Sequence, residues 1–506
     1  MTSTSADISP DLAADGRAPA GWLHPLAAVL LLALAVRLPL AFWPNVTHPD
    51  EIFQYLEPAS RMLGHDVIVT WDWRDGIRSW FLPTLFEGPM LLGDWLAPGG
   101  RGAFIACRLV VALASLSIVI SAWFFGARVS RMHAIVAAFA AAIWFEIVYF
   151  APHTLSEPLA TALIVPAALL LTGAPSQNRL AIGGGLLALA LVWRFQYAPA
   201  MAVFALGACW KQWRNAVPMI AGGLVALLLS AMVDLAHGIM PFEWLILNIK
   251  QNLLHDRASE FGVSPAIVYL GLQSAIWSGA TLLLLCALWR GYRHVPLLIV
   301  AAVVNIAFHS SIAHKEYRFI FLSIVLLIVA AALGSADWAQ KMREKPAWRR
   351  WALPVVAGGW VFISLGLAEA TKPMQDNWMR GMGMAQLAAE LRGDSGLCAA
   401  AIYITSYHLL PGHERLVGSA PLYAFQTKDP LAKGRLGALA REHEAAFNRI
   451  LAPPDAASDL PADFSRRSCA DMGNDGMACI FARRGGCDAA AAGDFAINDV
   501  LVRLNY

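Results

Sequence analysis

The sequence predicts an α-helical protein that crosses a membrane many times. Hydrophobic residues occupy 58% of the 506 positions and charged residues only 15%, whereas a soluble globular protein carries about 45–50% apolar and about 25% charged residues. The apolar residues are concentrated in long runs, and a helix needs about 20 such residues to cross the hydrocarbon core. The net charge of +2 is too small to indicate a nucleic-acid partner.

Eleven apolar stretches are candidate transmembrane helices. They cover about residues 22–44, 102–126, 132–150, 156–173, 179–194, 197–210, 216–236, 267–289, 295–312, 317–336 and 351–370. The fifth and sixth are short and meet at the sequence WRFQYAP, so we expect tilted or broken segments there. Arg37 and Arg108 lie within or near the ends of apolar stretches, and we expect loop carboxylates to pair with them because an unpaired charge in lipid is costly.

The basic residues of the connections predict the orientation. Lys and Arg dominate every second connection, namely ARVSRMH, PSQNR, KQWRN, RGYRH and QKMREKPAWRR. The positive-inside rule places such connections in the cytoplasm. The polar segment 1–21, which we expect to be disordered, is then cytoplasmic. The first long loop, residues 45–101, and the tail, residues 371–506, lie on the extracytoplasmic side.

Residues 22–370 form the predicted membrane domain, and the tail that follows has a different character. Short β-like runs alternate there with helix-like segments such as RLGALAREHEAAFNRIL, which predicts a small α/β domain. Four of the seven cysteines fall in the tail. An oxidising compartment would favour one or two disulfides, with Cys469 bonded to Cys479 or to Cys487. The cysteine spacing does not resemble a zinc site.

Four polar clusters lie at or beside the outer ends of the apolar stretches. They are NVTHPDEIFQYLEP (45–58), VTWDWRDGIRSWFLP (69–83), NIKQNLLHDRASEFG (248–262) and HSSIAHKEYRFIF (309–321). All four fall on the side assigned as extracytoplasmic, as the residues of a single active site must. We therefore expect them to meet there.

The first cluster contains two adjacent carboxylates, Asp50 and Glu51. Carboxylates favour the first turn of a helix and Asp is a common helix cap, so a structural role is one reading. Neighbouring residues at a helix start point in different directions, however. One carboxylate can face a reacting hydroxyl while a neighbour holds the other.

The last cluster places His314, Lys315, Glu316 and Arg318 between two apolar stretches. Ionisable groups at such positions usually line a functional cavity. The alternative is that their long side chains extend to the lipid headgroups. Basic residues anchor a helix least well on the non-cytoplasmic side, and a buried phosphate would account for Lys315 and Arg318 together.

The second cluster alternates aromatic and charged residues. Trp71, Trp73 and Trp80 fit an aromatic belt at the membrane interface. The charged residues between them, among them Asp72 and Arg78, favour a platform for a carbohydrate or a lipid headgroup instead.

These clusters resemble the signatures of the family-22 glycosyltransferases, the mannosyltransferases that extend glycosylphosphatidylinositol anchors and dolichol-linked oligosaccharides. HPDEIFQ (48–54) is similar to the family's first-loop signature and TWDWRDGIRSWFLP (70–83) to its tryptophan motif. CRLVVALAS (107–115) resembles its second span, and HKEYRFIF (314–321) its His-Lys-Glu motif. Order and spacing agree over about residues 30–335, whereas RFQYAP and the tail depart from the pattern. The compact loops and Ala-rich composition indicate a bacterial homologue in an inner membrane, with the outer side then being the periplasm.

The resemblance implies a GT-C membrane fold and an inverting glycosyltransferase without a cofactor or an obligatory metal. The implied donor is a polyprenyl-phosphate sugar, most simply mannose, and the implied acceptor a lipid-linked glycan or glycolipid. Asp50 is the implied catalytic base, with Glu51 as the alternate or as the orienting residue. The residues implied to bind the donor phosphate are His314, Lys315 and Arg318. The substrate pocket is expected to include His48, Gln54, Trp71, Asp72, Trp73, Arg78 and Glu316, with Glu57 and Glu157 as weaker candidates.

Two other functions compete with this interpretation. The first is a GT-C transferase of another branch that modifies protein or lipid A. The second is a transporter, but transporters usually show two related halves and a site near the midplane. The sequence shows no such duplication, and its polar clusters lie at one face.

Overall fold

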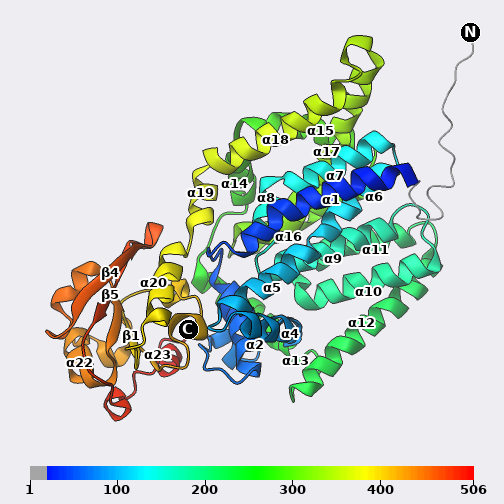
Figure 1. The fold of residues 1–506 in the computed structure, drawn as a ribbon. Coiled ribbons are helices and arrows are strands. Elements are labelled where there is room, and N and C mark those ends of the chain that lie inside the picture. Colours follow the sequence, from blue (N-terminus) through cyan, green and yellow to red (C-terminus); the bar gives the residue numbers. More distant parts are fainter. Residues whose placement is uncertain (1–19) are drawn as a thin grey trace, which may run out of the picture.

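The computed structural model describes residues 20–506, so most of the predicted disordered segment, residues 1–19, lies outside the described residues. A helical bundle and a smaller domain with a β-sheet follow one another along the chain (Figure 1). The smaller domain, coloured yellow to red, lies at one end of the bundle beside the first long loop.

Each of the eleven predicted stretches is helical. The helices are α1 (Ala20–Ala41), α5 (Arg101–Ala114), α6 (Leu116–Ala127), α7 (Arg131–Ile143), α8 (Phe145–Phe150), α9 (Ser156–Leu171), α10 (Gln177–Trp193), α11 (Ala198–Cys209), α12 (Ala216–Ala236), α14 (Val268–Trp277), α15 (Thr281–Gly291), α16 (Pro296–Ser311), α17 (Phe321–Glu344) and α18 (Ala352–Ala370). Apolar runs in lipid must satisfy their backbone hydrogen bonds internally, which a helix does. Within the described residues, 6 helical segments are long and apolar enough to cross a bilayer, and several others are shorter. A multi-pass membrane protein follows, while the count of eleven crossings stays a prediction.

The junction of the fifth and sixth stretches is broken, as the sequence predicts. Helix α10 ends where Arg194 takes an extended conformation (φ −149°, ψ 77°), and a 3₁₀ turn, Phe195–Tyr197, leads into α11. The break turns the Arg194 side chain toward a cavity described below. The third stretch is also broken, at Trp144, between α7 and α8.

Helix α17 is the centre of the bundle. Nearly all of its residues from Phe321 to Ala336 are buried, and it packs against α7, α15 and α16. The sequence is apolar on every side of this helix, which is typical of a helix surrounded by other helices. Its first turn follows residues that line a cavity described below, and its last turn lies at the opposite end of the bundle.

The smaller domain begins with α19 (Lys372–Met379) and α20 (Met382–Gly393). Its strands are β1 (Ala400–Tyr403), β2 (Leu422–Phe425), β3 (Arg449–Ala452), β4 (Ser465–Asp471) and β5 (Met477–Ala482), with α21 (His413–Val417), α22 (Leu436–Glu442) and α23 (Ile497–Arg503) around them. The strand order is β2-β1-β3-β5-β4; β1 pairs parallel with β2 and β3, and β5 pairs antiparallel with β3 and β4. The expected small α/β domain is therefore present.

Two disulfides stabilise this domain. Cys469 on β4 bonds Cys479 on β5, which is one of the two pairings expected from the sequence. Cys398 bonds Cys487 across 89 residues, a pair that spacing alone did not single out. Both disulfides lie in the domain predicted to face the oxidising side.

The first long loop is a folded unit that connects the two domains. It contains a π-helix (Glu51–Leu56), α2 (Glu57–Met62), α3 (Trp71–Arg74) and α4 (Phe81–Leu96), and α13 (Glu243–Ile249) packs beside it. Arg380 of the smaller domain donates to the Thr47 carbonyl at 2.8 Å, and the Asn498 side chain accepts from Val69 N–H at 2.8 Å. The smaller domain thereby contacts the loop near its start and again in its middle.

Candidate functional site

A cavity of about 1150 Å³ opens where the first long loop, the α16–α17 connection and the smaller domain meet. All four polar clusters of the sequence contribute to its lining. The predicted site residues that line it are His48, Asp50, Gln54, Trp71, Asp72, Arg78, His314, Glu316 and Arg318. Three others, Glu51, Trp73 and Lys315, are not among the lining residues.

Asp50 and Arg318 meet in this cavity although 268 residues separate them. Arg318 Nη2 donates to Asp50 Oδ2 at 2.6 Å, and His48 Nδ1 lies 3.3 Å from Asp50 Oδ1. Burial alone would raise the pKa of Asp50, but the charges of Arg318 and His48 hold that pKa well below its usual range. The Asp50 side chain makes no helix-capping bond, so the capping role considered for it is not observed.

Arg318 contacts two further carboxylates. Its Nε donates to Glu316 at 2.6 Å, and its Nη1 lies 3.1 Å from Glu157 Oε1. Glu157 also contacts Arg194 Nη2 at 3.1 Å, so two guanidinium groups share one buried carboxylate oxygen. Glu157, a weaker candidate in the sequence, therefore holds both cations at the cavity wall.

Arg194 is a cavity residue that the sequence motifs did not identify. Its guanidinium lies 4.6 Å from the ring centre of Phe319, on which Arg318 also packs at 5.2 Å. The Nε of Arg194 and the Nη1 of Arg318 are buried without a hydrogen-bond partner among the described residues. The signal in the sequence is a lone Arg at the break between two short apolar stretches, in the segment RFQYAP.

Glu316 connects the first cluster with the last. It lies 3.1 Å from His48 Nε2 and 2.9 Å from His314 Nε2. Burial would raise the pKa of Glu316, but Arg318 and His48 hold it well below its usual range. The hydrogen bond from His314 to Glu316 raises the pKa of His314 above its ordinary value. His314 therefore keeps its proton to a higher pH than a free histidine does.

Some residues of the tryptophan motif (70–83) line the cavity, and others pack behind it. Asp72 accepts hydrogen bonds from Thr70 Oγ1 at 2.5 Å and from Arg78 Nε at 2.9 Å, which fixes Arg78 at the cavity. Trp71 lines the cavity next to these groups. Trp73 instead packs on Trp80 with ring centres 4.6 Å apart.

Glu51 is fully buried behind the cavity. It accepts from Thr47 N–H at 2.7 Å and lies 2.9 Å from His153 Nδ1, which in turn is 2.8 Å from Arg108 Nη2. Burial would raise the pKa of Glu51, but His153 and Arg108 lower it to about 2. Arg108 therefore reaches a loop carboxylate through His153 and not by direct contact.

Two other cations have partners that the sequence did not predict. The ammonium of Lys315 donates to the Ser264 carbonyl at 2.9 Å and to the Ile312 carbonyl, and it does not line the cavity. The last carbonyls of a helix lack partners within it, and Lys315 satisfies one of them at the end of α16. Arg37 binds Ser115 and two backbone carbonyls of α7, so the expected pairing with a loop carboxylate is wrong for Arg37.

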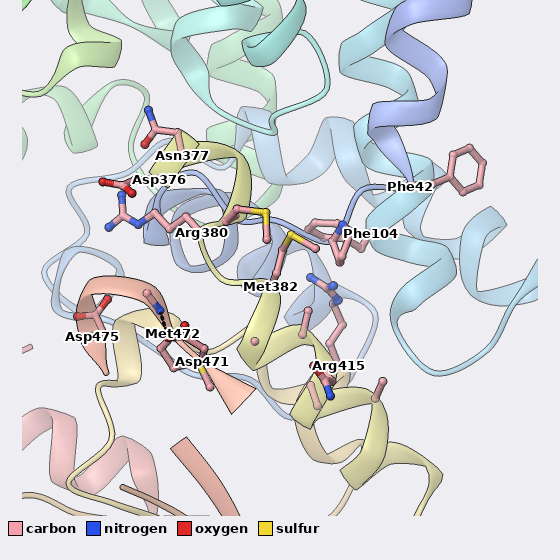
Figure 2. A pocket seen from close by; sticks show the side chains of 18 of the residues that line it. Phe42, Phe104, Asp376, Asn377, Arg380, Met382, Arg415, Asp471, Met472 and Asp475 are labelled. Carbon is pink, nitrogen blue, oxygen red and sulfur yellow. Dashed lines mark hydrogen bonds between the residues drawn. The ribbon is translucent and has the colours of Figure 1, made fainter. Parts of the chain in front are cut away.

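A second cavity, of about 1310 Å³, adjoins the first (Figure 2). Phe104 comes from α5, Arg380 from the segment that joins α19 to α20, and Met382 from the start of α20. Asp471 and Asp475 come from the end of β4 and the turn that follows. The two cavities share the lining residues Tyr317, Asn377, Arg380 and Asp475. Neither is lined by the one group of described residues that has the spacing of metal ligands.

Comparison with known proteins places this site in a family. GPI mannosyltransferase 3 of Yarrowia lipolytica is 29% identical over 61% of this chain and 61% of its own length. GPI mannosyltransferase 4 of Eremothecium gossypii is 24% identical over 61% of this chain and 65% of its own length. The matched region therefore spans less than two thirds of either relative.

A solved structure shares the fold. ArnT from Cupriavidus metallidurans, bound to undecaprenyl phosphate, superposes with a TM-score of 0.60 at 14% identity, covering 94% of this chain and 100% of that chain. At this identity the likeness concerns the fold alone, and it supports the GT-C architecture. Residues 28–380 match the sequence model of the Alg9-like mannosyltransferase family, a range that contains the first loop, Arg194 and the His-Lys-Glu motif. The chain therefore belongs to the Alg9-like mannosyltransferase family.

Proposed function

We propose that the protein transfers mannose from a polyprenyl-phosphate donor to a lipid-linked glycan or glycolipid on the extracytoplasmic face, with inversion at the anomeric carbon. The observation that carries the proposal is the meeting of Asp50 with Arg318 in one cavity. A glycosyl transfer needs a base for the acceptor hydroxyl and positive charge for the departing phosphate, and this pair provides one of each.

Asp50 is the proposed base. The acceptor oxygen attacks the anomeric carbon while the bond from that carbon to the phosphate oxygen breaks and its electrons pass to the phosphate. The proton of the acceptor hydroxyl passes to Asp50. Glu51 is the weaker choice because its carboxylate is fully buried and bonded to Thr47 N–H and His153.

Arg318, Arg194 and His314 are the proposed ligands of the donor phosphate. The Nε of Arg194 is buried without a hydrogen-bond partner among the described residues, and Arg318 carries its charge at the cavity wall. Guanidinium groups bind phosphate oxygens with charge-assisted hydrogen bonds. A phosphate bound to Arg318 would replace Asp50 as its partner, so donor binding would release the base. Lys315, which bonds backbone carbonyls and is not among the lining residues, is assigned to positioning the loop that carries His314.

The second cavity is the proposed place of the acceptor. It shares Asn377 and Arg380 with the first, so an acceptor lying in it can present a hydroxyl near Asp50. Trp71, Asp72 and Arg78 offer the first cavity an aromatic face and fixed polar groups, which is the usual composition of a sugar-binding surface.

Reconstitution tests this function. The purified protein in lipid nanodiscs should transfer radiolabelled mannose from polyprenyl-phosphate mannose to a glycolipid extract, and α-mannosidase digestion of the product reports inversion of a β-linked donor. Transfer from a nucleotide sugar alone, or transport of label without a new glycoside, would overturn the proposal. Transfer of another hexose from the same carrier, with mannose inactive, would assign the chain a different sugar.

A matched pair of variants tests the phosphate site. Arg194→Ala should raise the donor concentration for half-maximal rate by at least about tenfold, the scale of one lost charge-assisted contact, with the acceptor dependence unchanged. Arg214→Ala removes an exposed arginine outside both cavities and should leave both dependences as they are. An unchanged donor dependence in Arg194→Ala would remove Arg194 from the site.

A further inference from the structure

Two histidines and an aspartate converge at the end of the bundle remote from the cavity. His133 lies in the first turn of α7, His294 in the connection between α15 and α16, and Asp337 near the end of α17. Asp337 is separated from Phe321, which lies beside the cavity, by about 24 Å of helix at a rise of 1.5 Å per residue. His133 and His294 belong to the basic connections ARVSRMH and RGYRH, which the sequence predicts to be cytoplasmic.

The three side chains have the spacing of metal ligands. Asp337 Oδ1 lies 3.0 Å from His133 Nε2 and 3.1 Å from His294 Nε2, and all three possible ligand atoms lie within 4.8 Å of one another. Donor atoms bound tetrahedrally at 2.0–2.1 Å from zinc are about 3.3 Å apart. The three side chains can therefore bind an ion after small movements of the two imidazole rings.

A hydrogen bond behind His133 orients its ring. Ser130 Oγ lies 2.7 Å from His133 Nδ1, on the opposite side of the ring from Asp337. Histidines that bind metals almost always have such a partner on the second nitrogen, because it fixes the tautomer and the direction of the ligating nitrogen. His133 is 1% exposed, while His294 and Asp337 are 19% and 23% exposed, so solvent can reach the side left for a fourth ligand.

Close helix contacts place these residues. A Cβ on Gly291 would lie 1.9 Å from the Ala330 carbonyl oxygen, and one on Gly334 would lie 1.9 Å from the Ala287 carbonyl oxygen. The backbones of α15 and α17 thus touch one turn before His294 and Asp337. The contact therefore fixes the helix that carries Asp337 and the helix end from which the His294 connection starts.

We propose that His133, His294 and Asp337 bind a divalent transition metal ion, zinc being the best match, with solvent as the fourth ligand. Two imidazoles and a carboxylate suit zinc and its first-row neighbours and not magnesium or calcium, which prefer oxygen ligands. The ion would join the inner ends of α7 and α17 to the α15–α16 connection. It would be a structural clamp, remote from the transfer reaction.

Metal analysis of the intact protein tests this assignment. Protein in nanodiscs, treated with a chelator and dialysed, should take up one equivalent of Zn²⁺ by mass spectrometry of the eluted metal. Its thermal unfolding midpoint should rise with Zn²⁺ and not with Mg²⁺. Co²⁺ in place of Zn²⁺ should give the visible absorption of a four-coordinate ion.

Variants separate a built site from surface histidines. His294→Gln and Asp337→Asn should each lose the bound equivalent and the thermal shift, and Ser130→Ala should weaken zinc binding about 10–100-fold, as the loss of a ligand's hydrogen-bond partner does. His24→Gln, which removes an exposed histidine at the start of α1, should bind as the parent does. Equal zinc uptake by the parent and His294→Gln, or no Zn²⁺-dependent shift in the parent, would show a metal-free hydrogen-bonded cluster and overturn the proposal.

Discussion

The side chains of two neighbouring residues, Asp50 and Glu51, have very different surroundings. Asp50 faces the cavity with a side chain 19% exposed and contacts Arg318 and His48 there, whereas Glu51 is 0% exposed and bonded to a backbone N–H and a buried histidine. Both carboxylates have a lowered pKa, so charge state does not distinguish them. What distinguishes them is access: a substrate in the cavity can displace the partners of Asp50, whereas the partners of Glu51 are buried with it.

The local backbone produces this division. Asp50 precedes a π-helix, Glu51–Leu56, in which the wider turn places successive side chains differently from an α-helix. π-Turns occur frequently at functional sites. The carboxylate that remains in the buried network can stiffen the loop, while its neighbour stays available to a ligand.

The largest expected effect is on catalysis by Asp50. Asp50→Asn keeps the shape of the side chain and one acceptor oxygen for Arg318 but removes the charge and the base. General-base catalysis typically contributes about 10²–10⁴-fold to the rate. We expect kcat for transfer to fall by that factor while the thermal unfolding midpoint changes little.

The matched control is Asp66→Asn, an exposed carboxylate of the same loop outside both cavities, which should keep the parent rate. Near-normal turnover in Asp50→Asn together with an inactive but folded Glu51→Gln would exchange the two roles.

Glu51→Gln should act on stability. The change leaves His153 and Arg108 without their carboxylate, and breaking a buried ion pair from one side costs about 3–5 kcal/mol. The pKa of Glu51 is lowered to about 2, so in the parent its stabilisation is complete above the unfolded pKa and is lost as pH falls toward 2. Thermal unfolding in nanodiscs between pH 3 and 6 should show this acid loss in the parent and not in Glu51→Gln.

Sequence reasoning succeeded where a residue's role follows from its position in a motif. The four clusters do share one cavity, and the eleven apolar runs are helices. The family resemblance favoured Asp50 over Glu51 as the base, but the residues alone did not give the surroundings of either carboxylate, because these depend on where His153 and Arg318 lie after folding. The phosphate role expected for Lys315 stays a prediction, because a motif shows that a cation is present and not whether unsatisfied carbonyls at a helix end attract it.

Arg194 shows a limit of motif reading in the other direction. It stands outside the motifs, and only the break between α10 and α11 turns it into the cavity beside Arg318. The break is visible in the sequence as two short apolar stretches, but the direction of a side chain at a break depends on tertiary packing. The same limit hid His133, His294 and Asp337, which come from three segments far apart in the chain.

Glu57 extends the comparison to a second buried glutamate of the same loop. It accepts from Ile68 N–H at 2.6 Å and His413 N–H at 3.2 Å, and burial raises its pKa to about 7. Its folded-state pKa is above the unfolded value, so its stabilisation is present below about pH 4.5 and is lost as pH rises through 7. The loss is on the order of 3 kcal/mol, at 1.36 kcal/mol per pKa unit.

The parent should therefore unfold more easily at pH 8 than at pH 5, and Glu57→Gln should flatten this slope whatever its absolute stability. A slope that is the same in both proteins would mean that Glu57 is ionised across this range.

The smallest expected effect is that of Lys315→Met, compared with Arg318→Lys. Lys315 bonds only to backbone carbonyls, and hydrogen bonds from a charged group contribute about 1.5–3 kcal/mol. Lys315→Met should lower the unfolding midpoint modestly. Because Lys315 does not line the cavity, the donor dependence should stay within about twofold of the parent. A tenfold change would require about 1.4 kcal/mol of differential donor binding. Arg318→Lys loses the planar fork that holds Asp50, Glu157 and Glu316 together, so it should raise the donor requirement. If Lys315→Met raises the donor requirement as much as Arg318→Lys does, the ammonium must leave its carbonyls and enter the cavity when the donor binds, and the division between a positioning lysine and a phosphate-binding arginine is wrong.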